Sequence, residues 1–379
     1  MKLFIAGDFC ESYRTKDLLS SENVPYLIGD MEDTIKSADY SIVNFEFPIV
    51  NGDSHTAIKK AGPNLKGKEK SVEFLMTADF KACTLANNHI LDWGASAALY
   101  TKEVLEKAGI STVGFGSDNI EANRTLYYTK GNETLAIINC CEHEFSVTEK
   151  DEPGANALDP IIQYYAIKEA KKKADYVIVI AHAGIEMLQL PTAEMVKNYH
   201  FFIDSGADVV VNHHQHCYSG IEKYQGKFIF YGLGNFLFDW EGKRDSSWNE
   251  GMAVTFDLNH DDITYTLHCY TQCNEEPIVE LKKENDFVFS KYSLNELQKI
   301  IVSGKELDKL LNEFYKNNCE SEWLKLEPYK GYFSSRLFAH GLLPSTLTMS
   351  KVTELLNRIS CESHRERIVF ALKQWINNH

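Results

Sequence analysis

Short apolar runs recur along the first 240 residues, and five of them end directly in polar side chains of the kinds that bind metal ions. The clearest is 207–211, a largely β-branched run that predicts a buried strand and is followed by three histidines within four residues. Stretches with a helical pattern separate the runs, so the alternation indicates a layered α/β fold. In such folds, ligands bind beyond the carboxyl ends of the strands. The five predicted strand ends carry Asp8; Glu46; Asn88 with His89; His182; and His214 with His216.

The chemistry of this set favours a metal site. Carboxylate oxygens, imidazole nitrogens and one amide suit zinc, manganese or iron, and they do not suit calcium or copper(I). Glu46 stands in a mostly apolar run, where a buried carboxylate costs several kcal/mol unless it is paired or bound to a metal. The set is large enough for two ions that share Glu46 as a bridge. Two ions about 3.5–4 Å apart support hydrolysis, with phosphate esters as the first substrates to consider.

Parts of this pattern also have a purely structural explanation. Asp8 could cap a turn, and 87–89 could provide ordinary capping at a strand-to-helix turn. The histidines at 213–216 could form a solvated loop. Glu142, His143 and Glu144 follow another predicted strand and suggest surface or substrate-side roles. The recurrence of polar groups at successive strand ends favours a shared site over these alternatives.

The candidate substrate-side residues are Lys60, Glu186 and Asn235. Lys60 belongs to 51–70, an aperiodic stretch that is the most basic part of the chain; it is either a solvated loop or a lid that contacts an anionic substrate. Glu186 lies just beyond His182. Asn235 follows two glycines at 232 and 234, which suggest a close approach of the backbone.

Charge and composition exclude several classes of protein. The net charge of −15 disfavours a broad nucleic-acid-binding face, and an anionic substrate would need a metal or a local basic pocket. The amino terminus becomes polar too soon for a signal peptide, and no run approaches the roughly 20 apolar residues that span a bilayer. We therefore expect a cytoplasmic protein with no membrane span. The nine cysteines lack Cys-x-x-Cys spacing, which indicates reduced, mostly buried thiols and disfavours structural zinc on cysteines.

Six segments of the first 270 residues, in this order, resemble the CapA family of poly-γ-glutamate and capsule biosynthesis proteins, within the calcineurin-like metallophosphatase superfamily. The segments are Gly7-Asp8, Asn44–Pro48, Leu85–His89 with Asp92 and Gly94, His182–Glu186, His213–His216 and Tyr231–Phe236. The resemblance implies a four-layer α/β/β/α sandwich with a two-metal site at the strand ends. It implies metal-binding roles for Asp8, for Glu46 as the bridge, for Asn88 on the second metal, and for His182, His214 and His216.

The same resemblance implies that His89 is the general acid toward the leaving group. Two positions depart from the usual metallophosphatase pattern. Cys10 stands where most members have a histidine, so the first metal site either lacks that ligand or uses the Cys10 thiolate. Ile90 replaces the aspartate that usually follows the catalytic histidine, which makes Asp92 the candidate for orienting His89.

We expect residues 1–285 to form a CapA-like metallophosphatase domain, and 286–379, with leucine and aromatic residues at helical spacing, to form a helical accessory domain. The predicted function is a hydrolase with two divalent metals (manganese, zinc or iron) in capsule or exopolymer biosynthesis. It would cleave a phosphoester, or an amide of a γ-glutamyl or glycan-linked polymer, in an anionic small molecule or polymer. The alternative is a non-catalytic metal-binding assembly factor whose helical region docks capsule-synthesis proteins.

Overall fold

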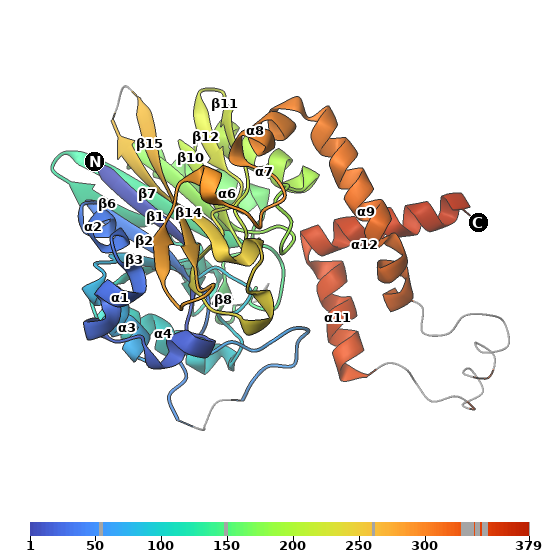
Figure 1. Ribbon diagram of the computed structural model, residues 1–379, viewed down its shortest axis with the longest axis horizontal. Coiled ribbons are helices and arrows are strands. Elements are labelled where there is room, and N and C mark those ends of the chain that lie inside the picture. The colour runs from blue at the N-terminus through green and yellow to red at the C-terminus, as the bar shows by residue number, and fades with distance from the viewer. Residues whose placement is uncertain are drawn as a thin grey trace.

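The computed structural model describes residues 1–52, 56–147, 151–259, 262–326, 337, 342 and 348–378. Within these residues, two large sheets form the body of the protein (Figure 1). The first sheet contains β1 (Lys2–Cys10), β2 (Tyr40–Phe45), β3 (Ala82–Thr84), β4 (Ser111–Val113), β13 (Asn235–Phe238), β14 (Glu250–Leu258), β15 (Ile263–Gln272) and β16 (Val279–Leu281). The second contains β6 (Leu126–Lys130), β7 (Glu133–Cys141), β9 (Tyr176–His182), β10 (Val209–His213), β11 (Ile221–Tyr224) and β12 (Lys227–Phe230).

The strand order places β1 at the centre of the first sheet, and β9 and β10 at the centre of the second. The first sheet runs β16-β15-β14-β1-β2-β3-β4, and β13 pairs with β1 off this path. The second runs β11-β12-β10-β9-β7-β6. A small antiparallel pair is formed by β5 (Phe115–Gly116) and β8 (Gly154–Ala155). The helices are α1 (Val24–Ile28), α2 (Met31–Lys36), α3 (Lys70–Thr77), α4 (Gly94–Lys107), α5 (Asn119–Ala122), α6 (Pro160–Ala170), α7 (Ala193–Ser205), α8 (Leu294–Ser303), α9 (Lys305–Leu326), α11 (Met349–Ser360) and α12 (Glu362–Asn378).

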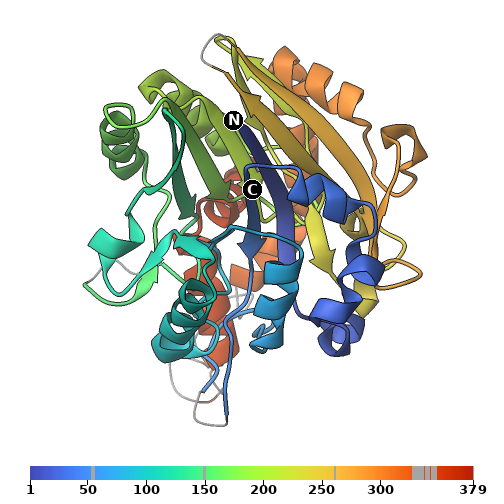
Figure 2. The ribbon, with the colours of Figure 1, turned by 90° about the vertical axis from the view of Figure 1, so that its left-hand side faces the viewer.

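The alternation of side chains along the strands creates the layers. In β1, Leu3 and Ile5 join the apolar core between the two sheets, whereas Phe4 and Ala6 join the core on the outer face of the first sheet. Helices α1 to α4 cover that outer face, and α6 and α7 cover the outer face of the second sheet (Figure 2). The arrangement is a four-layer α/β/β/α sandwich, so the predicted fold class is confirmed.

Parallel pairing brings the functional strand ends together. β1 pairs in parallel with β2, with Asp8 opposite Asn44, and β9 pairs in parallel with β10, with His182 opposite His213. Because both pairs end at the same edge of the sandwich, the side chains that follow them meet between the two sheets.

The helices α9, α11 and α12 stand beside the α/β body (Figure 1). Tyr315 of α9 packs against Phe370 of α12 with ring centroids 5.3 Å apart. Helix α12 meets the body where Ser363 Oγ donates a 2.6 Å hydrogen bond to Glu142 Oε1. Leu294 of α8 and Leu307 of α9 both belong to the apolar core between the sheets. The division near residue 285 stays a prediction. Among the described residues, no helix combines the length and apolar character that a bilayer crossing requires.

Candidate metal centre

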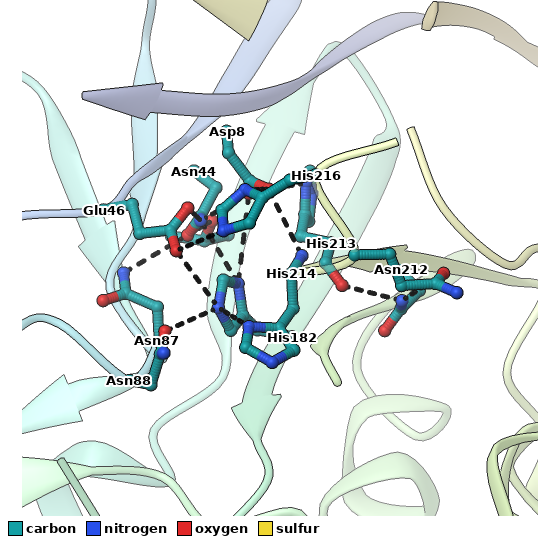
Figure 3. Close-up of polar contacts among 12 residues, drawn as sticks. Asp8, Asn44, Glu46, Asn87, Asn88, His182, Asn212, His213, His214 and His216 are labelled. Atoms are coloured by element: carbon teal, nitrogen blue, oxygen red, sulfur yellow. Dashed lines mark hydrogen bonds and ion pairs between the residues drawn. The ribbon is translucent and has the colours of Figure 1, made fainter. Parts of the chain in front are cut away.

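One group of side chains gathers around the carboxylate of Asp8, which is fully buried in β1 (Figure 3). Asp8 Oδ2 lies 3.4 Å from His216 Nδ1, and Asp8 Oδ1 lies 3.5 Å from His213 Nδ1. Asn44 Nδ2 donates a hydrogen bond of 2.7 Å to Asp8 Oδ1. Ligand atoms of Asp8, Glu46 and His216 all lie within 4.8 Å of one another, close enough to converge on one metal ion.

A second group surrounds His182 at the end of β9 (Figure 3). His182 Nε2 lies 3.0 Å from Asn88 Oδ1 and 3.1 Å from His214 Nδ1. The same nitrogen lies 3.6 Å from Glu46 Oε1. Ligand atoms of Glu46, His182 and His214 are again within 4.8 Å of one another. The two groups therefore share Glu46, which follows directly after β2.

The electrostatics of Glu46 test whether cations fit between these groups. Glu46 is fully buried, and its Oε1 has no hydrogen-bond partner among the described residues. Burial and the charge of Asp8 raise the pKa of Glu46 well above its usual range. Burial also opposes ionisation of Asp8, but contacts with His213 and His216 outweigh it and hold the pKa of Asp8 well below its usual range. A divalent cation would give Glu46 Oε1 a partner and offset the repulsion, so the donor set fits metal ions.

The turn after β10 aims its histidines inward at a cost in backbone strain. His214 and His216 have φ angles of 87° and 54°, in the left-handed region that side chains other than glycine rarely adopt. The His214 N–H donates a 3.3 Å hydrogen bond to Asp8 Oδ2, and Asn235 Oδ1 lies 2.9 Å from His216 Nδ1. Strained residues of this kind persist where their surroundings hold them, and they concentrate at functional sites.

His89 lies beside the second group, in the turn between β3 and α4. Its Nδ1 lies 2.7 Å from Asp92 Oδ2 and 3.0 Å from Lys60 Nζ, and Lys60 also forms an ion pair with Asp92. Burial and the Lys60 ammonium lower the pKa of His89, and they outweigh the opposing effect of Asp92. Because Nδ1 is engaged by Asp92, Nε2 is the ring atom left for proton exchange.

A cavity of 540 Å³ adjoins His89 and Asn88. Lys60 and Glu186 line it from the α/β body, and α11 and α12 supply further wall residues, including Arg358. Its volume lies in the range of small-molecule sites. The cavity joins the carboxyl ends of the strands to the C-terminal helices, although these segments lie far apart in the sequence.

The structure brings together most of the residues expected from sequence. The predicted ligands that meet in the two groups are Asp8, Glu46, Asn88, His182, His214 and His216. Asn235 was expected on the substrate side, but it is fully buried in β13 and contacts His216 instead. Cys10 belongs to neither group. Its thiol donates a hydrogen bond to Glu11 O at 3.7 Å, and burial raises the pKa of the thiol. The eight cysteines whose side chains the structure describes are buried and free, which confirms that expectation for them.

Two further residues of the centre were not singled out from the sequence. Asn44 contacts Asp8 and lies 3.3 Å from His182 Nδ1. It precedes Glu46 by two positions, so the two-residue period of a strand could have placed both on one face. His213 lies in the histidine cluster at the end of β10, opposite His182 in the strand register. The contact of its Nδ1 with Asp8 Oδ1 is seen only in the folded structure.

Comparison with known proteins identifies the family. The profile of the family described as "Bacterial capsule synthesis protein PGA_cap" matches residues 2–240, a range that includes both groups. The chain belongs to this family. The PGA_cap match confirms the resemblance to CapA proteins noted from the sequence motifs.

Two Bacillus relatives carry the CapA name. The PGA_cap chain is 34% identical over 247 residues to the PGA biosynthesis protein CapA of Bacillus subtilis (strain 168), covering 64% of each chain. It is 29% identical over 257 residues to the capsule biosynthesis protein CapA of Bacillus anthracis, covering 65% of this chain and 62% of the relative. The PGA_cap chain thus spans less than two thirds of the length of these curated relatives.

Solved structures with similar folds are more distant. A putative 5'-nucleotidase from Staphylococcus aureus in complex with alpha-ketoglutarate has 13% sequence identity and a TM-score of 0.45, covering 80% of this chain and 58% of its own. The calcineurin-like phosphoesterase YfkN from Bacillus subtilis has 10% identity and a TM-score of 0.42, covering 82% of this chain and 98% of its own.

Proposed function

We propose that this PGA_cap protein is a hydrolase that uses two divalent metal ions and acts on an anionic substrate in capsule or exopolymer synthesis. The observation that carries the proposal is the pair of ligand groups that share Glu46. Asp8, Glu46 and His216 would hold one ion, and Glu46, Asn88, His182 and His214 would hold the other. Two such ions, when bound, supply Lewis acidity and activate water for attack on a phosphoester or an amide.

The residues around the ions suit proton transfer and substrate orientation. His89 lines the cavity and is held by Asp92, an arrangement that fixes the ring and its tautomer. We assign proton transfer to the leaving group to His89 and orientation of its ring to Asp92. Asn235 orients His216 through the 2.9 Å contact. The metal is manganese, zinc or iron, and phosphoester and γ-glutamyl substrates are the two classes to test.

Alanine substitutions at His216 and His89 separate metal binding from catalysis. His216→Ala is expected to lower the metal content more than His89→Ala, because only His216 belongs to a ligand group. His89→Ala is expected to retain metal and to lower kcat about 10²- to 10⁴-fold, the usual contribution of a general acid. Elemental mass spectrometry gives the metal content, and phosphodiester, phosphomonoester and γ-glutamyl substrates give kcat.

Two results would overturn this assignment. Equal metal content in both variants and the unsubstituted protein would remove the metal-binding role of His216. Metal-loaded protein that turns over none of the three substrate classes would remove the hydrolase proposal.

The basic residues Lys60 and Arg358 of the cavity wall are proposed to bind the anionic part of the substrate. The protein carries a net charge of −15, so an anion needs local positive groups to enter. Arg358 of α11 lines the same cavity as Lys60 and forms an ion pair with Glu354 on its own helix. Arg358→Gln is expected to raise KM about tenfold with a smaller change in kcat, since a hydrogen bond to a charged group contributes about 1.5–3 kcal/mol.

The matched control for this variant is Arg365→Gln. Arg365 is exposed on α12 and lies outside the cavity wall. Michaelis–Menten kinetics of both variants test the idea, and equal KM values for the two would contradict it.

One observation favours the assembly-factor alternative. Helix α11 exposes the large apolar side chains Val352, Leu356 and Ile359, which lie on one side of the helix at spacings of four and three residues. Such a face suits docking to a capsule-synthesis protein. If a His89→Ala variant, which retains its metal but has lost most of its turnover, still supports polymer production in the native host, assembly is the function. If production stops, hydrolysis is the function.

A further inference from the structure

A third set of metal-binding side chains lies where the C-terminal helices meet the α/β body, and two of its members, Glu144 and His364, line the cavity beside the two-metal centre. Ligand atoms of Glu144, Cys361 and His364 all lie within 4.8 Å of one another. Glu144 belongs to the segment after β7, whereas Cys361 and His364 flank the first turn of α12. Residues three apart at a helix start share one face, so the Cys-x-x-His spacing presents thiol and imidazole together.

Burial and unpaired oxygens distinguish this cluster from an ordinary polar contact. Cys361 is fully buried, and the Glu144 side chain is 5% exposed. Glu144 Oε1 lies 3.5 Å from His364 Nδ1. Among the described residues, Glu144 Oε2 and the neighbouring Asn357 Oδ1 are buried without a hydrogen-bond partner. Buried oxygens of this kind cost free energy unless a donor or a cation satisfies them.

The carboxylate of Glu142 also contacts the Cys361 thiol, but Glu142 is not among the residues whose ligand atoms lie within 4.8 Å of one another. Glu142 Oε2 lies 3.1 Å from Cys361 Sγ. Glu142 also accepts a 2.6 Å hydrogen bond from Ser363 Oγ, which fixes its carboxylate against α12. The thiolate, imidazole and carboxylate of Cys361, His364 and Glu144 are donor types that zinc binds in proteins.

We propose that Glu144, Cys361 and His364 bind a zinc-class ion that ties α11 and α12 to the α/β body. The ion would hold the helical wall of the cavity, which includes Asn357 and Arg358, in place beside the two-metal centre. This site departs from the expectation that cysteines take no part in structural zinc binding. It is independent of the hydrolase proposal, because none of its ligands belongs to the two-metal groups.

The competing explanation is a thiol that donates a hydrogen bond to Glu142 with no ion present. Cobalt(II) distinguishes the two, because a cobalt–thiolate bond gives a charge-transfer band in the near ultraviolet. The two-metal centre contains no sulfur ligand, so the band reports only the third site. Metal-free full-length protein is titrated with cobalt(II) without oxygen, alongside Cys361→Ser, Glu46→Gln and the control Cys269→Ser. Cys269 is a buried thiol on β15, outside all three clusters.

The band is expected in the unsubstituted protein, in Glu46→Gln and in Cys269→Ser, and it is expected to disappear in Cys361→Ser. By elemental analysis with zinc, Cys361→Ser should bind one ion per chain fewer than the unsubstituted protein, and it should retain kcat with a raised KM, because the cavity wall that carries Arg358 is no longer held. Absence of the band from cobalt-loaded protein, or its persistence in Cys361→Ser, would overturn the proposal. Circular dichroism of each variant shows that a lost band does not arise from unfolding. Failure of the hydrolase proposal would appear as absent turnover and would leave the band unchanged.

Discussion

Replacement of Glu46 by glutamine is expected to abolish binding of both ions at the two-metal centre and to lower kcat/KM about 10³-fold or more, equivalent to about 4 kcal/mol of transition-state stabilisation. Glutamine preserves the volume of this fully buried side chain but removes the charge that both ligand groups share. Its neutral amide cannot bridge two cations. The experiment measures bound metal by elemental mass spectrometry and turnover on the substrates of the unsubstituted protein.

A chelator gives a second readout for Glu46→Gln. Bound metal stabilises a folded protein by mass action, so EDTA should lower the melting temperature of the unsubstituted protein. EDTA should lower the melting temperature of the variant by less, because the two sites of its two-metal centre are already empty. Glu11→Gln is the matched control: Glu11 is also buried, but its Oε2 accepts hydrogen bonds from Lys68 N and Ser71 Oγ, outside both groups. Full metal content in Glu46→Gln would exclude a bridging role.

Gly7→Ala is expected to destabilise the fold by about 3 kcal/mol or more, through overpacking at the join between β1 and β13. A Cβ on Gly7 would lie 1.9 Å from Gly234 O, a contact with main chain that no side-chain rotation relieves. The clash cannot be avoided by a small shift, because Asp8 N–H donates to the same carbonyl oxygen at 3.1 Å. Separation of the strands would also move Asp8 away from Asn235, its neighbour in the register. Metal binding should therefore weaken together with stability.

Urea unfolding in the presence of EDTA measures this effect without a contribution from metal. Gly242→Ala is the control, because a Cβ at Gly242 has no atom within 4 Å and its backbone needs no left-handed φ. The control should unfold at the urea concentration of the unsubstituted protein, and Gly7→Ala should unfold well below it. Equal urea midpoints for the two variants would show that a Cβ at Gly7 does not destabilise the fold.

The sequence predicts the α/β core well because its signals are local. β9, a continuous apolar run, is buried along its whole length, as expected for a strand covered on both faces. The polar residues at successive strand ends converge because parallel strands place their carboxyl ends at one edge of a sheet. Asp8 shows what local evidence leaves open. The sequence alone is also compatible with a role for Asp8 in capping a turn, whereas the structure places the Asp8 carboxylate against His213 and His216.

The remaining features depend on contacts between distant segments, which no local pattern encodes. Arg358 reaches the cavity only because α11 packs beside strand ends that lie more than 150 residues earlier in the chain. The burial of Glu142 also depends on a distant segment. Its position after a predicted strand suggests surface exposure, but the packing of α12 buries it against Ser363. The position of Asn235 after two glycines suggests an amide on the substrate side. In the structure, the pairing of β13 with β1 places Asn235 against the ring of His216.

The most direct test of the two-metal centre is anomalous scattering from crystals of the full chain loaded with manganese. Two peaks are expected, both in contact with Glu46. One would lie between Asp8 and His216, and the other between His182 and His214. A single peak at Glu46, or none, would contradict a centre in which this carboxylate bridges two ions.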